Sequence, residues 1–593
     1  MYLSNLKLWN FRKFGSNSPL DLEKPDLDLN FKKGVNVLIG ENDSGKTAII
    51  DSIKLALKTH SYEWLKLNWD DFYDDSDRLR IELQFNNLSD DEAKNFIEWL
   101  GVTGEKDDAE SYLRLIYDAR RNTNEQYIYP SEIKAGTDEG GHQLTAEARE
   151  YLKTTYLKPL RDAKSELIPR KNSRLTQILQ GHEAFKGKDQ DHLLVELFKD
   201  FNNEVLQYFE GKDKDGEALT GENLKGQELK KEIDKFIGAF YSEKKESNFG
   251  ILGKSLKNIL EKLDLSIKDE INPGLGTLNR LFMASELLHL QKKNWTGLRL
   301  GLIEELEAHL HPQAQMQIIE ALKAEENIQL ILTTHSPNLA SKLKLQELII
   351  CNGKNAFPMG EEYTKLDSKS YRYLEKFLDT TKANLFFAKG IILVEGWAEE
   401  ILLPSIAKAM GINLTEKGVS IVNIGNIGFS HYANIYLRKE KPHMDIPVAI
   451  ITDADIKAYR KEKGSYIKEK TNVFSQETNK KIKSNNEKSE ENVKYYTGAH
   501  WTLEYALYCS SLLGEKFKAA CKNKHSRTDW DTNFEETLAE KLIDKTLKKT
   551  DIAYELALQI DNAVQDESFK ISTEVNDDSI SYLIQAIKYA TKY

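Results

Sequence analysis

The sequence predicts an α/β protein with two α/β units, the first of them interrupted by a helical insertion. A short apolar strand, a glycine-rich loop and a helical pattern follow one another between Gly34 and Leu57. Residues 147–264 are polar with helical spacing, and a new series of apolar strands with acidic ends begins at Ile391. The predicted boundaries are 1–165 and 264–382 for the first unit, 166–263 for the insertion and 383–593 for the second unit, which ends in helices.

The composition is that of a folded globular protein. Hydrophobic residues make up 40% and charged residues 30% of the 593 positions. No apolar run approaches the ~20 residues of a membrane span, and the N-terminus lacks the basic-then-apolar layout of a signal peptide. The three cysteines form neither a metal spacing nor an even disulfide set, so we expect a cytoplasmic protein with no membrane partner. The net charge of −11 argues against a wholly basic nucleic-acid binder but permits a local basic surface.

The first unit opens with strand patterns. Leu3–Phe11 alternates between apolar and polar residues, and Leu79–Phe85 and Tyr112–Tyr117 have the same character, so we expect them in a mixed sheet. The polar helical region that follows is divided by a Gly/Lys/Asp-rich break at Gly211–Gly226.

The stretch Gly40–Thr47 (GENDSGKT) fits the phosphate-binding template G-x-x-x-x-G-K-[ST]. An apolar strand, Gly34–Ile39, precedes it and helical spacing at Ala48–Leu57 follows it. We expect the loop N–H groups to face the phosphates, Lys46 to reach the outer phosphates and the Thr47 hydroxyl to bind Mg²⁺. The alternative is a chance match in a polar loop. The residues expected around the nucleotide are Gly40, Asn42, Ser44, Gly45, Lys46 and Thr47.

Two further apolar strands end in residues suited to nucleotide hydrolysis. Leu298–Glu305 ends in paired acids, of which Glu304 can hold Mg²⁺ and Glu305 can orient the attacking water as a base. Ile328–Leu332 is followed by His335, which can reach the γ-phosphate or that water. Taken singly, the acids would be a solvated strand end and the histidine a helix cap. Their order and spacing after a phosphate loop favour an ATPase site.

The second unit also has apolar strands with acidic ends. A strand from Gly390, a tight turn and a helix start carry Glu395 and Glu399, and a later strand ends in Asp453 and Asp455. The i, i+2 spacing points both aspartates to the same side of an extended chain. Four carboxylates at adjoining strand ends suit Mg²⁺ or Mn²⁺ rather than zinc, and two such metals can support in-line phosphodiester cleavage. Each motif alone is more often a turn or a helix cap, but the ordered set predicts a metal site.

The first unit resembles the ABC-type ATPase heads of chromosome-maintenance and recombination proteins, and most sharply those of the OLD (overcoming-lysogenisation-defect) nucleases. Glu304–Pro312 looks like the Walker B and D-loop run of that family, although Leu306 replaces its usual proline. The departure alters the loop's rigidity without removing a catalytic group. His309 and His311 diverge on a helix, so we interpret them as structural or D-loop residues rather than as a metal pair.

The resemblance adds further nucleotide-site residues. Asn272–Asn279 sits where the ABC signature is expected, and small residues such as Gly276 would let the γ-phosphate of a partner head approach the backbone. By similarity, Arg12 lies against the nucleotide. Tyr156–Ala163 also resembles OLD sequences.

The second unit is similar to a Toprim domain, and Glu399 resembles the OLD version of it. The resemblance adds Glu504 as a later acid and Lys549 as a late lysine that would offset developing charge on the scissile phosphate. Without the resemblance, Lys549 would be a solvated helix lysine. The tract Lys457–Lys494 holds eleven Lys/Arg residues against six acids, and is either a solvated loop or a surface that tracks phosphates.

The resemblance implies an ATP-binding and ATP-hydrolysing DNA endonuclease that needs Mg²⁺ or Mn²⁺, with two metals in the Toprim site. It also implies a role in bacterial anti-phage defence of the Gabija and retron kind. Partners there are a helicase, or a retron reverse transcriptase with its nucleic acid. The alternative is a non-nucleolytic ATP-dependent DNA-binding or repair protein with a structural Toprim-like domain. The intact carboxylate set favours the nuclease, since a structural remnant has no reason to hold buried like charges together.

We expect a homodimer or higher homo-oligomer formed through the helical insertion, because its two helical arms can fold back on each other and offer an apolar face to a second copy. The alternative is a solvated helical decoration.

Overall fold

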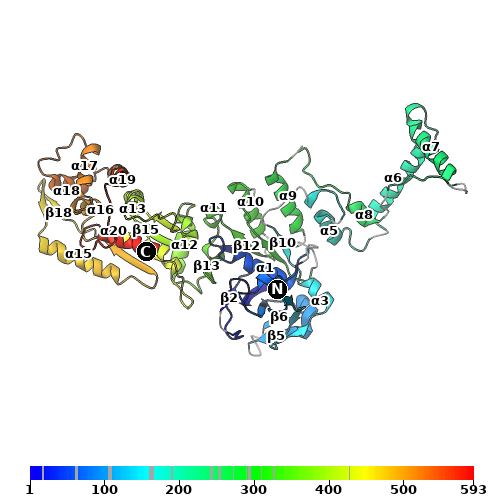
Figure 1. Cartoon of the computed structure of the whole chain (residues 1–593), viewed down its shortest axis with the longest axis horizontal. Helices are drawn as coiled ribbons and strands as arrows, with labels where there is room; N and C mark the ends of the chain where they lie inside the picture. The colour runs from blue at the N-terminus through cyan, green and yellow to red at the C-terminus, as the bar shows by residue number, and fades with distance from the viewer. Residues whose placement is uncertain are drawn as a thin grey trace.

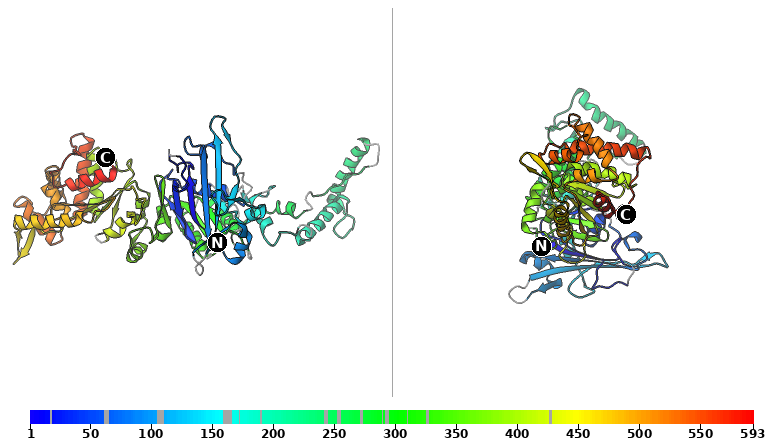
Figure 2. Two further views of the ribbon diagram at one scale, coloured as in Figure 1. Left: turned by 90° about the horizontal axis from the view of Figure 1, so that it is seen from below. Right: turned by 90° about the vertical axis from the view of Figure 1, so that its left-hand side faces the viewer.

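The chain forms three parts in a row, seen here in a computed structural model (Figure 1). The two sheets of the N-terminal unit lie in the middle, the C-terminal α/β unit lies at one end and a helical arm extends from the other (Figure 2). The structure describes residues 1–593 except 17–18, 61–64, 105–109, 159–165, 172, 189–190, 241–244, 252–254, 271–272, 289, 291–294, 309, 325–326 and 426–427. Within the described residues, no helix has the length and apolar content needed to cross a membrane.

A six-stranded sheet carries the phosphate loop. Its strand order is β10-β11-β12-β3-β13-β14, and all neighbouring pairs are parallel except the antiparallel edge strand β14. Because β12 lies between β11 and β3, the carboxyl ends of three motif-bearing strands meet at one edge. The bounds are β3 Val35–Ile39, β10 Thr155–Leu157, β11 Leu300–Ile303, β12 Gln329–Thr334, β13 Leu348–Asn352 and β14 Asn355–Pro358.

The three strands expected near the N-terminus pair with one another in a separate, wholly antiparallel sheet. Helix α1 (Lys46–Leu57) packs between the two sheets, where Ile49, Ile50 and Ile53 join the buried apolar face of each. The antiparallel sheet comprises β1 Tyr2–Trp9, β2 Leu27–Asn30, β4 Arg78–Asn86, β5 Leu100–Thr103, β6 Glu110–Asn122, β7 Tyr127–Ile128, β8 Ile133–Ala135 and β9 His142–Gln143. Short helices α2 (Asp90–Ala93) and α3 (Ala146–Tyr151) adjoin it.

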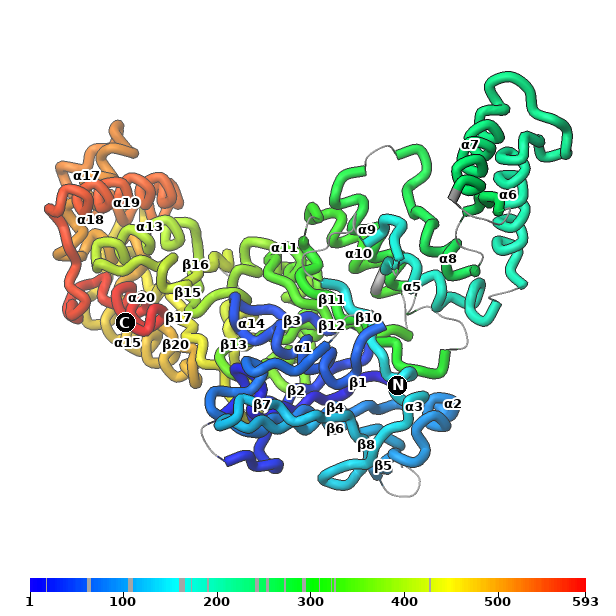
Figure 3. Tube along the Cα trace, turned by 45° about the vertical axis from the view of Figure 1, so that its right-hand side comes forward, coloured from blue at the N-terminus to red at the C-terminus, as the bar shows by residue number. Residues whose placement is uncertain are grey.

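The predicted insertion is helical. Helices α6 and α7 lie side by side at the tip of the arm (Figure 3). At its base, Arg174 of α5 forms a buried ion pair with Glu286 of α9, with Nη2 2.6 Å from Oε2. The bounds are α5 Arg174–Gly181, α6 Leu193–Phe209, α7 Lys225–Phe240, α8 Leu256–Leu260 and α9 Leu275–Leu287.

The second unit is built on a four-stranded parallel sheet with the order β16-β15-β17-β20. Its strands are β15 Gly390–Val394, β16 Val419–Asn423, β17 Val448–Thr452 and β20 Val493–Thr497. One face is covered by helices that share a core with it, namely α13 Trp397–Ala409, α16 Leu503–Cys509, α17 Gly514–Lys524, α18 Phe534–Ile543, α19 Lys549–Gln565 and α20 Ser581–Thr591. A hairpin of β18 (Tyr459–Glu462) and β19 (Ser465–Lys468), followed by α15 (Thr471–Asn486), adjoins them.

One hydrophobic core runs from the phosphate-loop sheet into the second unit. It starts under α10 (Pro312–Lys323) and α11 (Pro337–Ala340), passes through α12 (Ser368–Phe377) and reaches the other face of the parallel sheet beside α14 (Phe429–Ala433). Leu374 and Leu385 are buried in it together with Leu393 of β15. On the surface of this joint, Lys389 forms an ion pair with Glu41 of the phosphate loop at 3.4 Å. The two units are therefore packed together and not merely tethered.

Candidate functional site

The phosphate loop, which follows β3, contains two glycines that other residues cannot easily replace. Gly40 and Gly45 have φ values of +144° and +101°. A Cβ on Gly40 would lie 2.5 Å from the Cys351 carbonyl oxygen, and one on Gly45 would lie 2.6 Å from the Phe14 ring. The loop therefore packs closely against its surroundings and turns its backbone into the start of α1.

The Lys46 ammonium folds back over this loop. Its Nζ donates to the carbonyl oxygens of Gly40 (2.9 Å) and Glu41 (2.6 Å), and lies 3.2 Å from the Ser44 hydroxyl. Burial lowers the pKa of Lys46. A triphosphate would compete with these carbonyls for the ammonium, as a phosphate-binding lysine requires.

Glu304, directly after β11, faces the phosphate loop. The Thr47 hydroxyl donates to its Oε2 (3.1 Å) and the Tyr156 hydroxyl donates to its Oε1 (2.8 Å). The carboxyl is buried, and this burial raises its pKa although both hydrogen bonds act in the opposite direction. A hydroxyl and a buried carboxylate in contact suit Mg²⁺. Tyr156 lies in the stretch that resembles OLD sequences, but its contact with Glu304 was not predicted.

The paired acids and the histidine meet between β11 and β12. Glu305 has φ +46°, and its N–H donates to the Thr333 hydroxyl at 3.0 Å. Both oxygens of Glu307 are occupied, because Oε2 accepts from the Thr334 hydroxyl (2.8 Å) and Oε1 from the His335 N–H (2.6 Å). Burial and the nearby Lys46 charge lower the pKa of His335, so its imidazole is neutral at neutral pH. Glu307 was expected only as part of the D-loop run, and here it fixes the backbone that presents His335.

The other residues expected at the nucleotide are placed as follows. The Arg12 guanidinium donates to Asp71 (2.9 Å) and to Asp51 of α1 (2.7 Å), so carboxylates already balance its charge. Gly276 lies in the first turn of α9, and its expected contact with a partner head stays a prediction. His311 caps α10, where its Nδ1 accepts from the Ala314 N–H (3.3 Å). Three expectations fall outside the described residues: Asn272, His309 and positions 159–163.

Four carboxylates gather at the carboxyl edge of the parallel sheet, and we call them the acidic cluster: Glu395, Glu399, Asp453 and Glu504. Oε1 of Glu395 accepts from the Thr452 hydroxyl (2.5 Å) and the Asp453 N–H (3.2 Å). Oδ2 of Asp453 accepts from the N–H of Leu503 at the start of α16 (3.1 Å). Glu399 lies in the first turn of α13, where the helix dipole favours a negative charge.

Lys549, the first residue of α19, supplies a positive charge to the acidic cluster. Its Nζ lies 2.9 Å from Oε2 of the buried Glu504. Burial lowers the pKa of Lys549, but the charge and hydrogen bond of Glu504 together with the charges of Asp453 and Glu399 outweigh it, and the net shift is upward. Burial and the neighbouring carboxylates raise the pKa of Glu399 to about 7 and raise that of Asp453 well above its usual range. Glu504 and Lys549, which only the sequence resemblance added to the predicted site, thus lie in electrostatic contact with it.

The expectation that Asp453 and Asp455 lie on an extended chain was wrong. Strand β17 ends at Thr452, and Asp455 has φ +59° with its N–H bonded to the Trp501 carbonyl (3.1 Å). The chain is therefore not extended across the Asp-x-Asp motif, and Asp455 is exposed while Asp453 turns toward Glu395. The charge of Asp455 still helps to raise the pKa of Glu395.

In the described part of the chain, no three His, Cys, Asp or Glu side chains form a ready-made metal cage. The chemistry of the acidic cluster nevertheless fits a hard divalent cation. All its donors are oxygens, and burial together with the neighbouring carboxylates raises the pKa values of Glu399 and Asp453, both of which a bound cation would offset. Metal binding would require the side chains to draw closer together.

A tyrosine that the sequence analysis missed lies beside the acidic cluster. Tyr582 of α20 is 7% exposed, and its hydroxyl has no hydrogen-bond partner among the described residues. A Cβ on Gly498 would lie 3.4 Å from that oxygen, and the Gly498 N–H donates to the Thr452 carbonyl (3.0 Å), next to Asp453. Burial, followed by the charges of the acidic cluster, raises the Tyr582 pKa, so the phenol keeps its proton. Nothing in the local sequence around this residue indicates a site.

The basic tract 457–494 is not a solvated loop, because it folds as the β18–β19 hairpin and α15. Two hairpin lysines are paired with acids of or next to α18: Lys461 with Asp544 (2.9 Å) and Lys468 with Glu535 (2.6 Å). These pairs reduce the positive charge available to bind the phosphates of a nucleic acid.

Comparison with known proteins matches both units. Residues 1–340 match the family model described as AAA ATPase domain, and residues 386–455 match that described as overcoming lysogenization defect protein-like, TOPRIM domain. The Endonuclease GajA of Bacillus cereus (strain VD045) is 23% identical over 490 residues, which cover 79% of this chain and 77% of the relative. The OLD nuclease of Thermus scotoductus (strain ATCC 700910 / SA-01) is 23% identical over 479 residues, covering 77% and 82%. Among solved structures, the C-terminal region of the Xanthomonas campestris pv. campestris OLD protein aligns with a TM-score of 0.24 and 20% identity, covering 35% of this chain and 95% of that one.

Proposed function

Because the chain belongs to the AAA ATPase domain family and carries the TOPRIM domain of overcoming-lysogenization-defect-like proteins, we propose that it is an ATP-regulated, metal-dependent DNA endonuclease. The ATPase site regulates the protein and the Toprim site cleaves phosphodiester bonds. The observation that carries the proposal is the acidic cluster with Lys549 at one edge of the parallel sheet. A purely structural domain has no use for carboxylates that raise one another's pKa values.

In the proposed cleavage site, the acidic cluster and Asp455 would hold Mg²⁺ or Mn²⁺ through oxygen ligands. Two such ions would supply charge stabilisation to the attacking and leaving oxygens of the phosphodiester. Lys549, which is paired with Glu504 in this structure, would supply a positive charge for the scissile phosphate if Glu504 were to hold a metal instead. The Tyr582 hydroxyl keeps its proton and has no partner among the described residues, so with metal bound it would be able to donate to a carboxylate of the acidic cluster and orient it.

At the ATPase site, Lys46 neutralises the outer phosphates, while Thr47 and Glu304 hold Mg²⁺. Glu305 acts as the base that orients the attacking water. The neutral His335 ring hydrogen-bonds to the γ-phosphate or to that water.

We propose that the helical arm mediates self-association. Along one face of α6, Leu193, Leu197 and Phe201 are spaced four residues apart and are 51–64% exposed. We call them the apolar stripe of α6. A second copy would cover this stripe and bring a second ATPase head within reach, where the α9 segment around Gly276 would complete the nucleotide site.

The proposed biological role is anti-phage defence in the bacterial cytoplasm. It is supported by the resemblance to OLD nucleases of Gabija and retron systems. The partner would be a helicase, or a retron reverse transcriptase with its nucleic acid.

Plasmid cleavage in Mg²⁺ or Mn²⁺, with and without ATP, tests the proposal. Asp453→Ala and Glu395→Ala are expected to abolish cleavage and to leave ATP binding intact, because both residues lie far in the fold from the phosphate loop. Glu400→Ala is the matched control, since this carboxylate lies on the same helix as Glu399 but bonds to Asn423 (3.1 Å). Undiminished cleavage by either cluster variant would refute the assignment. Absence of cleavage by the parent protein with either metal would favour the non-nucleolytic DNA-binding alternative.

A further inference from the structure

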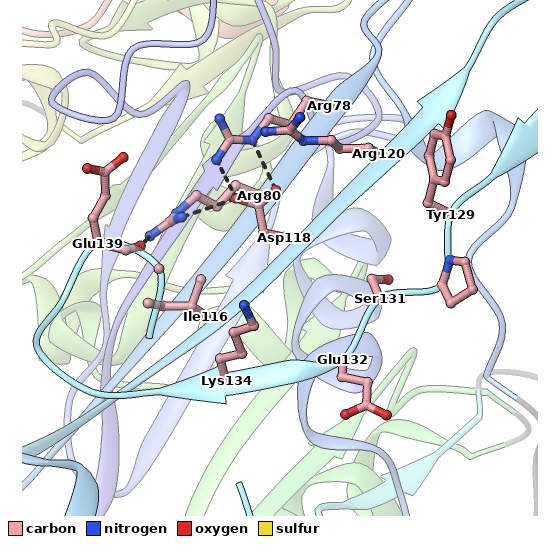
Figure 4. Close-up of a pocket in the computed structure, with 12 residues that line it drawn as sticks. Arg78, Arg80, Ile116, Asp118, Arg120, Tyr129, Ser131, Glu132, Lys134 and Glu139 are labelled. Carbon is pink, nitrogen blue, oxygen red and sulfur yellow. Dashed lines mark hydrogen bonds and ion pairs between the residues drawn. The ribbon is translucent and has the colours of Figure 1, made fainter. Parts of the chain in front are cut away.

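The antiparallel sheet has a cavity of about 350 Å³ on the face that points away from α1 (Figure 4). The apolar residues of β4 and β6 face α1, so alternation along these strands places their charged residues on the cavity side. Residues that line it include Arg78, Arg80, Asp118, Arg120, Tyr129 and Lys134.

The strand register places two positive charges opposite each other. Arg78 of β4 is the direct cross-strand partner of Arg120 of β6. Like charges in this position are destabilising unless something neutralises them. Asp118 is shared by two arginines, because it accepts from Arg78 (Nε, 3.0 Å) and from Arg80 (Nη1, 3.1 Å). One carboxylate thus serves two guanidinium groups and is not available to a third.

Arg120 and Lys134 remain as available cations. Both side chains are exposed, and neither has a hydrogen bond or an ion pair to any residue that the structure describes. Figure 4 shows the Lys134 ammonium pointing into the cavity, whereas the carboxylates of Glu132 and Glu139 point away from it. Glu132 is moreover bound by Arg149 at 3.0 Å. The cavity therefore presents two cations, Arg120 and Lys134, that have no partner among the described residues. They lie over a floor formed by Arg80, which is only 2% exposed and is itself paired with Asp118 and with Glu82 (2.7 Å).

Exposed aromatic rings adjoin these cations. Tyr129 lines the cavity and is 46% exposed, and Tyr127 beside it is 49% exposed. The two rings meet edge to face with centroids 5.4 Å apart. Cations that can bind phosphates next to exposed rings that can stack on bases are the surface that single-stranded nucleic acids bind.

We infer that this cavity is a binding site for a nucleic-acid single strand, separate from both the ATPase site and the acidic cluster. Arg120 and Lys134 contact backbone phosphates, which also relieves the repulsion between Arg78 and Arg120. Tyr129 stacks on an adjacent base, a contact that a paired and stacked duplex base does not offer. The site does not depend on DNA cleavage.

The test is fluorescence anisotropy of the full chain with a labelled single-stranded oligonucleotide, in EDTA and without ATP, over a range of salt concentrations. For Arg120→Ala/Lys134→Ala, the slope of log K against log salt should fall by about 1.4, or roughly 0.7 for each lost phosphate contact. The matched control is Lys33→Ala/Lys66→Ala, which removes the same charge from two exposed lysines of the same unit outside the cavity. Melting curves should show that none of the four substitutions destabilises the fold.

Stacking gives an independent measurement. Tyr129→Ala should weaken binding roughly fivefold or more, and Tyr129→Phe should restore it, since stacking is worth about 1 kcal/mol or more for each base. Equal changes in slope for the two double variants would overturn the proposal, because they would show a general charge effect. Displacement of the oligonucleotide by poly-glutamate as readily as by unlabelled strand would also overturn it and would indicate an acidic polypeptide instead. Displacement by duplex DNA or by inorganic phosphate at equal phosphate concentration would refute the single-strand assignment.

Discussion

Replacing Tyr582 with phenylalanine removes one oxygen atom and leaves the ring in place. The hydroxyl is buried and has no hydrogen-bond partner among the described residues. A buried, unsatisfied hydroxyl costs about 1–3 kcal/mol. Without divalent metal, Tyr582→Phe should therefore leave the free energy of unfolding unchanged or raise it by about 1 kcal/mol.

Tyr589→Phe is the matched control, because this residue lies on the same helix and its hydroxyl donates to the Asn492 carbonyl at 2.9 Å. Losing that hydrogen bond should lower the free energy of unfolding by about 1 kcal/mol. In EDTA the two variants should thus differ by about 1–2 kcal/mol, with Tyr582→Phe the more stable.

Mg²⁺ should reverse the order of stability, so that the parent protein has a higher free energy of unfolding than Tyr582→Phe. Metal binding stabilises the folded state by RT ln(1 + [Mg²⁺]/Kd). If the Tyr582 hydroxyl orients a metal-binding carboxylate, its loss should weaken metal affinity about 10- to 100-fold. That corresponds to about 1.4–2.8 kcal/mol of lost stabilisation at saturating metal. Urea unfolding midpoints with EDTA and with Mg²⁺ measure both effects. An Mg²⁺-induced shift equal to that of the parent would refute the role, and destabilisation in EDTA would show that the hydroxyl has a partner.

Three other predictions follow from the described contacts. Lys46→Ala should weaken nucleotide binding, whereas Glu305→Ala should bind ATP but stop hydrolysis; parental turnover by the latter would place the base elsewhere. The pKa of Glu399 is raised from 4.5 to about 7, so the unfolded state loses this proton first as the pH rises. In EDTA, the free energy of unfolding should fall by at most about 3 kcal/mol as the pH rises from 4.5 to about 7. Glu399→Gln should flatten this pH dependence, measured by urea titrations. Phe201→Asp, in the apolar stripe of α6, should lower the mass measured by light scattering, while Ile97→Asp, at a still more exposed apolar position of the head, should not. An unchanged mass for Phe201→Asp would place the interface elsewhere.

Much of both sites could be predicted because the deciding signals are local. A phosphate loop needs a strand before it and a helix after it, and both are confirmed as β3 and α1. The strands that carry Glu304 and His335 were recognisable as apolar runs with polar ends, and they are confirmed as β11 and β12. Parallel strands in adjoining positions then bring their carboxyl ends together. The α/β class followed from these strands, whereas the ABC-type and Toprim assignments came from the resemblance to known families.

The missed features depend on contacts between distant parts of the chain. Tyr582 reaches Gly498 across more than eighty positions, and no local pattern encodes that approach. The hairpin within 457–494 pairs with acids of the later helical region, so a charged run that would be solvated alone becomes ordered. Asp455 was misplaced because β17 ends at Thr452 and the left-handed backbone at Asp455 interrupts the alternation on which the geometric argument relied.

The continuous core between the two sheets determines how a signal can pass from one active centre to the other. A flexible linker would let the centres move independently, and their communication would then depend on chance encounters. Here Lys389 contacts the phosphate loop and is followed immediately by β15, the strand that leads to Glu395. A shift of the loop by a fraction of an ångström would therefore be passed to the strand through the ion pair and the packed core. Amino-acid changes that soften this joint would be expected to leave each chemistry intact and to abolish the dependence of one on the other.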